Sequence, residues 1–377
     1  MKFLFSRKAI ILYAGLAFGI LSSLLVKWGN PANMGFCNLC FLRDIAGGLK
    51  LHSSAITQYL RPEIFGLVVG ATAAALVSRE FRPRGGSSPL VRFVLGFFIA
   101  IGSLIFLACP WRTLLRLGGG DLSALFGIAG LVVGVVIGII FLRRGFSLGR
   151  SKTTSAMAGW IMPVIFVVLL LFAVFSASFL ASSTSGPGSL HPAIWISLVV
   201  GLFFGVVAQR VRFCTIGGWR DLIMVKDTYL FLGLIGLFVG VLATNYIVGF
   251  FGEGGTSVPG GTMAYSWSFT KQPIALPGVD GEGVLRWTDF LWGAGGMVLV
   301  GLASVLAGGC PMRQMILSGE GDTDAGSTIV GMLIGAAVAM SFGFASSGSG
   351  PGALGPWALA AGLAVCLVIG FTMREKA

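Results

Sequence analysis

Long apolar stretches with few charged residues recur from one end of the chain to the other. A helix needs about 17 to 25 mainly apolar residues to cross a lipid bilayer. With 55% hydrophobic and only 11% charged residues, the chain offers too little polar surface to fold in water. The sequence therefore predicts an all-α integral membrane protein with about ten spanning helices, near 9–27, 63–79, 91–109, 122–142, 157–181, 192–208, 229–251, 289–308, 327–344 and 354–373.

The distribution of Lys and Arg indicates an orientation for these helices. Basic residues concentrate on the cytoplasmic side of a membrane, and most of them fall on that side if the N-terminus is inside. The outer loops at 182–190 and 345–353 then hold none. The first apolar run lacks a clear small-x-small cleavage site, so we expect a retained span rather than a signal peptide. The prediction is a multi-pass protein of the bacterial cytoplasmic (inner) membrane with both termini cytoplasmic.

Two cysteine elements occur twice, which indicates an internal duplication. The first is a cysteine followed at a fixed spacing by an Arg-Asp pair: Cys37, Arg43 and Asp44, then Cys214, Arg220 and Asp221. The second is Cys-Pro-x-Arg followed at a fixed spacing by an aspartate: Cys109, Arg112 and Asp121, then Cys310, Arg313 and Asp322. Five spans per half is an odd number, so the second copy must enter the membrane from the opposite face. The sequence predicts two inverted five-helix repeats, 1–182 and 183–377, with an outer-loop insertion at 251–289.

The Cys-Pro elements have the features of broken helices. Proline suits the first position of a helix, and the cysteine before it would then be the N-cap. Free N–H groups and the helix dipole at that end favour anions, and Arg112 and Arg313 return to the same face three residues later. Transporters often build a midplane binding site from such broken helices. We therefore predict short re-entrant half-helices whose cysteines contact an anion that also favours sulfur.

The candidate site residues fall into three groups. The substrate path is assigned to Cys37, Cys109, Cys214 and Cys310, anion binding and its support to Arg112, Arg313, Arg43, Arg220, Asp44 and Asp221, and an accessory role to Cys40. A simpler interpretation is that a cysteine in an apolar span is a small buried hydrophobe, which is our interpretation of Cys366. Arginine beside a span is often a topology anchor. His52 and His191 follow no pattern.

Cys37 and Cys40 form a CxxC pair, which suggests redox chemistry when it lies in a soluble βαβ unit. This chain has no such context, and Gly217 occupies the position that matches Cys40 in the second half. A zinc site would need four clustered ligands. The chain also lacks the glycine-rich phosphate loop of ATP-driven proteins. We expect no metal, no cofactor and no direct use of ATP.

Several of these motifs resemble a known family. The run Asn30-Pro31-Ala-Asn-Met-Gly-Phe-Cys37, both Cys-Pro-x-Arg elements and Gly309-Cys310-Pro311-Met-Arg313-Gln314 are similar to the YeeE/YedE sulfur-transport family, and most to its selenium-linked YedE branch. The resemblance covers nearly the whole chain. It implies an hourglass-shaped transporter that passes a substrate's terminal sulfur from thiol to thiol through Cys37, Cys109, Cys214 and Cys310. It also implies a cytoplasmic sulfur carrier of the TusA type as a partner. The CxxC pair and the Arg-Asp elements depart from the thiosulfate pattern, which leaves the substrate open.

We thus expect a non-enzymatic transporter for uptake of a small sulfur- or selenium-containing compound, with no nucleic-acid partner. Moving an anion inward against an inside-negative potential costs about 2.3 kcal/mol per charge per 100 mV. Uptake therefore needs proton or sodium coupling, a neutral substrate, or consumption of the substrate inside. Two alternatives stay open, namely a membrane thiol/disulfide oxidoreductase using Cys37 and Cys40, and an anion channel-like pore. The 251–289 loop would gate the outer funnel or shield it.

Overall fold

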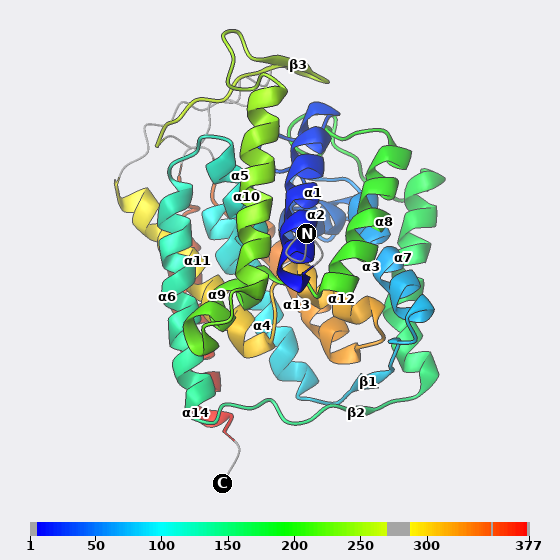
Figure 1. Ribbon diagram of the computed structural model, residues 1–377, viewed down its shortest axis with the longest axis vertical. Coiled ribbons are helices and arrows are strands. Elements are labelled where there is room, and N and C mark those ends of the chain that lie inside the picture. Colours follow the sequence, from blue (N-terminus) through cyan, green and yellow to red (C-terminus); the bar gives the residue numbers. More distant parts are fainter. Residues whose placement is uncertain (1–5, 270–286, 348–349, 375–377) are drawn as a thin grey trace.

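The computed structural model describes residues 6–269, 287–347 and 350–374, and nearly all regular structure within them is helical (Figure 1). The first half contains α1 (Arg7–Lys27), α2 (Asn38–Gly48), α3 (Pro62–Val77), α4 (Pro89–Phe106), α5 (Pro110–Gly118), α6 (Ala124–Arg143) and α7 (Ala156–Val174). The second half contains α8 (Ile194–Val211), α9 (Thr215–Val225), α10 (Tyr229–Ile247), α11 (Trp287–Ala307), α12 (Pro311–Gly319), α13 (Thr323–Ser341) and α14 (Gly355–Thr372).

The long helices have the length and composition of membrane spans. Within the described residues, nine helical segments are long and apolar enough to cross a bilayer. The remaining predicted span, near 63–79, is α3, whose 16 residues make it shorter than the others. At 1.5 Å per residue it extends about 24 Å, against a hydrocarbon core of about 30 Å. The prediction of a multi-pass, all-α membrane protein is confirmed.

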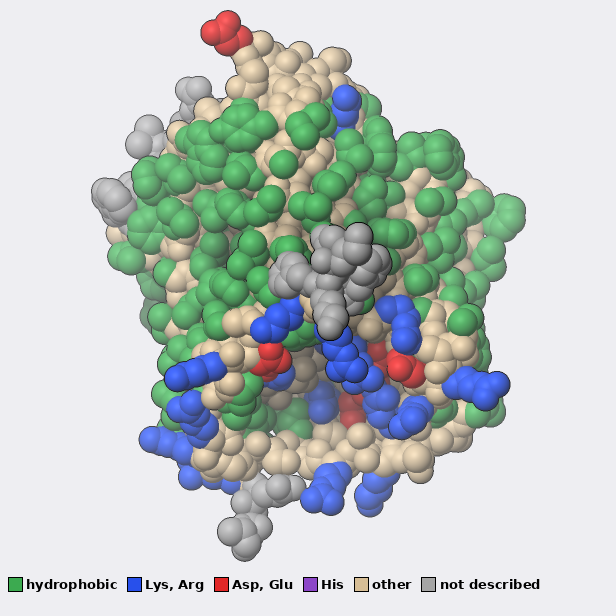
Figure 2. All heavy atoms as spheres, viewed as in Figure 1, with side chains coloured by type: hydrophobic (Ala, Val, Ile, Leu, Met, Phe, Trp, Pro, Cys, Tyr) green, Lys and Arg blue, Asp and Glu red, His purple; other side chains and the backbone are tan. Residues whose placement is uncertain are grey.

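Short strands mark the two ends of the molecule. One end carries the two-stranded pair β1 (Arg84–Gly85) and β2 (Lys152–Thr153), and the other carries β3 (Thr256–Val258) and β4 (Gly261–Met263). Figure 2 shows Lys and Arg gathered toward the β1–β2 end, below a broad hydrophobic band. We call this the basic end. A basic end next to an apolar band is the pattern of a membrane protein whose basic side faces the cytoplasm, and this orientation stays a prediction.

Four long helices of the first half each pack against a helix of the second half, and we call these the exchanged pairs. The closest pairs are α1 with α10, α3 with α8, α4 with α13 and α6 with α11. Gly29, just after the end of α1, lies against His191, just before the start of α8. At the opposite ends of these two helices, Arg7 and Arg212 both interact electrostatically with Tyr229. Helices α1 and α8 therefore run antiparallel. The two halves thus pack closely against each other, while the inverted repeats 1–182 and 183–377 stay a prediction.

Glycine lies where the exchanged pairs cross. A Cβ added to Gly19 of α1 would overlap the carbonyl of Leu237 in α10, and one added to Gly205 of α8 would overlap the carbonyl of Leu67 in α3. Small residues allow two backbones to approach this closely, and such contacts drive helix association in lipid. The many glycines of the spans therefore hold the two halves together.

The Gly19→Ala variant is expected to lower the free energy of unfolding by about 1–3 kcal/mol, because the added methyl group overpacks a backbone contact. The measurement is reversible unfolding of the purified protein in detergent. Gly295→Ala is the matched control, since a Cβ at Gly295 would meet only the flexible side chain of Leu359. Equal stability of the Gly19→Ala variant and the native protein would contradict the proposed packing role.

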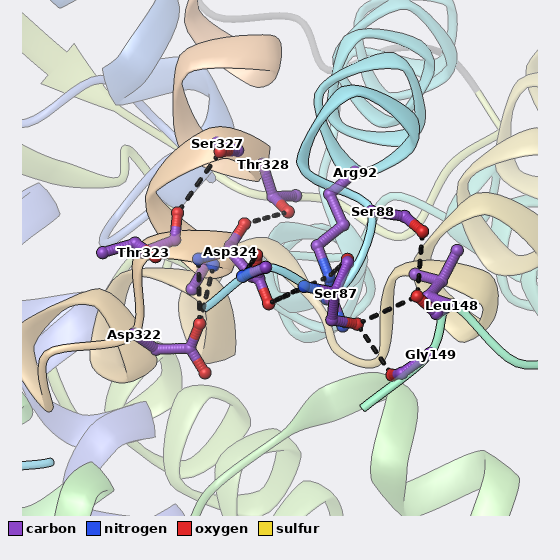
Figure 3. A network of polar contacts seen from close by, with 12 residues as sticks. Ser87, Ser88, Arg92, Leu148, Gly149, Asp322, Thr323, Asp324, Ser327 and Thr328 are labelled. Carbon is purple, nitrogen blue, oxygen red and sulfur yellow. Dashed lines mark hydrogen bonds and ion pairs between the residues drawn. The ribbon is translucent and has the colours of Figure 1, made fainter. Parts of the chain in front are cut away.

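Polar contacts tie the segments at the basic end to the start of α13 (Figure 3). The Asp324 carboxylate accepts hydrogen bonds from the backbone N–H groups of Gly86 (2.9 Å) and Ser87 (3.0 Å). Ser87 in turn donates from Oγ to the carbonyl of Gly149 at 3.0 Å. Asp322 caps α13 by accepting from the N–H groups of its first turn. Asp324 thus joins α13 to the α3–α4 loop, and Ser87 joins that loop to the α6–α7 loop.

Candidate functional site

Four short helices begin at a buried cysteine. Cys37, Cys109, Cys214 and Cys310 are the N-caps of α2, α5, α9 and α12. Proline follows the cysteine in α5 and α12, as the sequence predicts, whereas the N-cap positions of Cys37 and Cys214 are found only in the structure. Helices α2 and α5 run from the protein centre toward the β3–β4 end, and α9 and α12 run toward the basic end (Figure 1). Four positive helix ends therefore converge on the centre.

Three thiols meet at the starts of α2 and α5, and we call them the first cysteine cluster (Cys37, Cys40 and Cys109). The Cys37 Sγ donates to the Cys40 Sγ at 2.8 Å and lies 3.6 Å from the Cys109 Sγ. The N–H of Cys40 donates to the Cys37 Sγ at 3.4 Å. All three are free and buried. Cys40 is thus part of the same cluster as the two predicted path residues.

Arg112 brings a positive charge to the first cysteine cluster. Its Nη1 donates to the Cys40 Sγ at 3.2 Å, and its Nε donates to the carbonyl of Asn33 at 3.0 Å. The Asn33 N–H donates to the Tyr265 hydroxyl at 3.2 Å, and burial raises the pKa of this tyrosine. Tyr265 lies in the loop after β4, so the described part of the predicted 251–289 insertion supports the segment that holds Arg112. Residues 270–286 of that prediction lie outside the described residues.

The second half brings together two thiols, the second cysteine pair (Cys214 and Cys310). The two side chains interact with each other, and Cys310 also interacts with the N–H of Thr215. The Gly217 N–H donates to the Cys214 Sγ at 3.2 Å, which repeats the bond between Cys40 and Cys37 without a third thiol. Both cysteines are buried and free.

The two Cys-Pro-x-Arg arginines differ in their contacts. Arg112 bonds to a thiol, whereas Arg313 lies with its Nη1 3.5 Å from the Glu320 Oε1. Glu320 is also 3.5 Å from Arg84 Nη2, and Arg84 pairs with Asp322 at 2.8 Å. The Arg313 backbone interacts with the Cys310 thiol, but among the described residues its side chain makes no hydrogen bond to a cysteine. The equivalence seen in the sequence therefore does not extend to the side-chain partners.

The Arg-Asp elements also differ between the halves. Arg43 and Arg220 each pair with the aspartate that follows, at 2.7 and 2.8 Å. The Arg43–Asp44 pair is buried and gains a third member, because Arg61 pairs with Asp44 at 2.7 Å. The Arg220–Asp221 pair is partly exposed, with side chains at 31% and 25% exposure. None of these four residues touches a cysteine through a hydrogen bond in the described part of the chain.

A buried aromatic cluster links the two sets of cysteines. Phe36 precedes Cys37 and Phe213 precedes Cys214 in the sequence. The ring of Phe36 lies 4.3 Å from that of Phe204, and the ring of Phe213 lies 5.2 Å from that of Phe18. The cluster is fully or almost fully buried and consists of Phe18, Phe36, Phe204, Phe213 and Trp111. Ring contacts therefore connect the residue before Cys37 with the residue before Cys214.

Sequence reasoning missed some of these residues. The repeated Gly-Leu-x-Phe-Gly element contains Phe18 and Phe204, so it held a signal for the aromatic cluster. Trp111 had no such signal, because Met312 occupies the matching position in the second half. Its Nε1 is buried without a hydrogen-bond partner among the described residues. Within the same residues, no group of three or more His, Cys, Asp or Glu side chains is arranged to hold a metal ion.

The fold and these buried cysteines define a multi-pass helical membrane protein with thiols at converging helix ends. No family model matches the chain. Over 38 residues, it is 50% identical to the thiosulfate transporter TsuA of Spirochaeta thermophila, which covers 10% of this chain and 12% of that protein. Over 124 residues, it is 29% identical to the thiosulfate transporter TsuA of Escherichia coli K12, which covers 33% of this chain and 28% of that protein. These local likenesses support the resemblance to the YeeE/YedE sulfur-transport family.

Proposed function

We propose that this protein is a transporter that takes up a small sulfur- or selenium-containing anion across the bacterial cytoplasmic membrane. The observation that carries the proposal is the first cysteine cluster with Arg112. Three thiols, one guanidinium and the N-termini of α2 and α5 meet in a buried place. This combination suits a solute that has a soft chalcogen atom at one end and negative charge at the other.

The chemistry of these groups supports anion binding without a covalent step. Sulfur is polarizable, so thiols make favourable contacts with soft atoms. Free N–H groups at a helix start and a charged guanidinium replace part of the water that an anion loses. Arg112 is held in place by the Asn33 carbonyl, which lowers the entropy cost of binding. The arrangement therefore offsets part of the desolvation of the charged end.

In the proposed path, the substrate moves from the first cysteine cluster to the second cysteine pair. The aromatic cluster between them must rearrange, which would make it the constriction between two funnels. We further propose that the two halves are inverted repeats and that alternating access exchanges their roles, as in other transporters of this architecture. The named relatives transport thiosulfate, so thiosulfate is the first substrate to test, with selenium species of the YedE branch as the second. A TusA-like carrier protein would be the cytoplasmic partner that receives the transported anion at the basic end.

A membrane thiol/disulfide oxidoreductase is the second candidate. The observation that favours it is the 2.8 Å distance between the Cys37 and Cys40 sulfur atoms. Such an enzyme would need both of these thiols and would tolerate loss of Cys310. A transporter would need Cys310 as well, because this residue belongs to the far part of the path.

The test is uptake of radiolabelled thiosulfate and of radiolabelled selenium compounds into proteoliposomes. We expect saturable uptake of one of them. Arg112→Met should weaken it by about 100-fold, since losing one partner of a buried charged contact costs about 2–5 kcal/mol. Arg313→Met is the matched control and should have a smaller effect, because Arg313 pairs with Glu320 rather than with a cysteine. Linear, unsaturable flux would instead indicate a pore, and no uptake of any compound would favour the oxidoreductase.

A further inference from the structure

A buried carboxyl group lies beside the segment that leads to the first cysteine cluster. Glu63, in the first turn of α3, is 0% exposed. Its Oε1 accepts two hydrogen bonds at 3.0 Å, one from Asn30 Nδ2 and one from Ser197 Oγ of α8. Its Oε2 is buried and has no hydrogen-bond partner among the described residues. None of the ion pairs of those residues includes Glu63.

Glu63 is joined to a group of buried charges through Asn30. Asn30 Oδ1 accepts from Arg61 Nη1 at 3.1 Å, while its Nδ2 donates to Glu63. Arg61 and Arg43 both pair with Asp44. We call these four ionisable residues the buried charge group (Arg43, Asp44, Arg61 and Glu63). Its formal charge is zero when Glu63 is ionised and becomes positive by one unit when Glu63 takes up a proton.

Other titratable groups around Glu63 are few. The segment before α3 contributes Tyr59, whose ring stacks on that of His191 at 4.1 Å. The loop before α8 otherwise contributes the carbonyls of Pro187 and Leu190, which accept from Arg61. Helix α8 contributes Ser197, and α7, which also packs on α3, contains no charged residue. The charge beside Glu63 is therefore set mainly by the buried charge group itself.

Two connections join the buried charge group to the first cysteine cluster. Asn30 Nδ2 also donates to the carbonyl of Gly35 at 2.9 Å, within the segment that leads into Cys37. Arg43 acts electrostatically on both Cys40 and Arg112. A change of charge at Glu63 is thus felt where we propose that the anion binds. Protonation of Glu63 would leave the buried charge group with one unbalanced positive charge next to the first cysteine cluster, which favours binding of the anion there.

We propose that Glu63 binds the proton that accompanies an anion into the first cysteine cluster. This inference rests on the proposed transport function. A buried carboxylate without an ion-pair partner is energetically costly, and proton uptake removes that cost while the anion balances the remaining arginine charge. By linkage, each ligand then strengthens binding of the other by the same factor. A proton fits better than a metal cation, because Asn30 presents a donor N–H to Glu63 rather than an oxygen ligand.

The first experiment compares thiosulfate transport by the native protein, Glu63→Gln and Glu80→Gln in proteoliposomes with the membrane potential clamped. A pH gradient, alkaline inside, should drive accumulation by the native protein and by Glu80→Gln. Glu80 is a suitable control because its side chain is partly exposed and bonds to Gln209 at 2.7 Å. Glu63→Gln should keep exchange of internal for external thiosulfate but lose the response to the gradient. Lowering the outside pH by one unit should increase apparent thiosulfate affinity by about tenfold in the native protein and leave Glu63→Gln unchanged.

Gradient-driven accumulation by Glu63→Gln would overturn the proposal, as would accumulation driven by a sodium gradient in the native protein. If Glu63→Gln does not fold, Glu63→Asp keeps a carboxyl group and should retain a weaker response. Infrared titration of purified protein gives a readout that needs no transport. Acidification should produce the carbonyl band of protonated carboxyls in the native protein, and one component of that band should be missing in Glu63→Gln. Absence of exchange of both thiosulfate and the selenium compounds in the native protein would reject the transport function alone, while the infrared band still decides whether Glu63 binds a proton.

Discussion

Uptake is expected to fall to background when Cys37, Cys109 or Cys310 is replaced by serine. Serine keeps the hydrogen-bonding capacity and the N-cap position, but it removes the polarizable sulfur that contacts a soft chalcogen atom. Cys37 and Cys109 lie 3.6 Å apart in the first cysteine cluster, and Cys310 interacts with Cys214 in the second cysteine pair. Each variant therefore interrupts the proposed path at one of its two parts. The measurement is initial uptake rate in proteoliposomes at matched protein density.

Cys366→Ser is the matched control for these variants. Cys366 is buried in α14 and is free, but it belongs to neither set of cysteines, so uptake should persist. Retention of uptake by both Cys109→Ser and Cys310→Ser would reduce the cysteines to packing residues and assign the anion to Arg112 and the helix ends. Loss of activity in Cys37→Ser and Cys40→Ser alone, with Cys310→Ser unaffected, would favour the oxidoreductase.

Asp44→Asn is expected to lower the free energy of unfolding by about 3–5 kcal/mol, because it leaves buried charges without a partner. The Asp44 side chain is 0% exposed, and both of its carboxylate oxygens accept from arginines that are themselves buried. Removing its charge would leave Arg43 and Arg61 facing each other. The measurement is the unfolding free energy of purified protein in detergent, supported by expression level in membranes.

Asp221→Asn tests whether burial is the cause. Asp221 follows Arg220 as Asp44 follows Arg43, and its ion pair has nearly the same length, 2.8 Å. Among the described residues Asp221 has one arginine partner, and it is partly exposed, so the loss should be about 0–1 kcal/mol. Equal losses in the two variants would contradict the assignment of the large effect to the buried charge group.

Local sequence was enough for the short helices of the candidate site. Proline after Cys109 and Cys310 fixes the backbone at a helix start, and it predicted both N-caps correctly. The same argument had no proline to use at Cys37 and Cys214, although both are N-caps too. Their role depends on the preceding segment folding back into the protein, which is a tertiary feature.

Side-chain partners were the least predictable part. Arg112 and Arg313 occupy matching positions, yet one contacts a thiol and the other contacts Glu320. The difference arises because the first half supplies a third thiol, Cys40, whereas the second half has Gly217 at that place and a glutamate within reach of the arginine. Matching motifs predict matching backbones, but the partner of Arg112 comes from α2, whereas the partner of Arg313 is the C-cap residue of its own helix, α12.

The sequence by itself determined the class of protein and the number of helices to expect. A chain this apolar can satisfy its backbone groups in lipid only through helices or closed barrels, and the length of each apolar stretch decides where a helix spans. Only the tertiary structure decided which residues meet. The packing of α3 on α8 brings Glu63 to Ser197 of the other half, and the folding of the first half brings Glu63 to Asn30 before α2. Contacts between residues so far apart in the chain depend on how helices cross, and helix crossing is set by packing rather than by local sequence pattern.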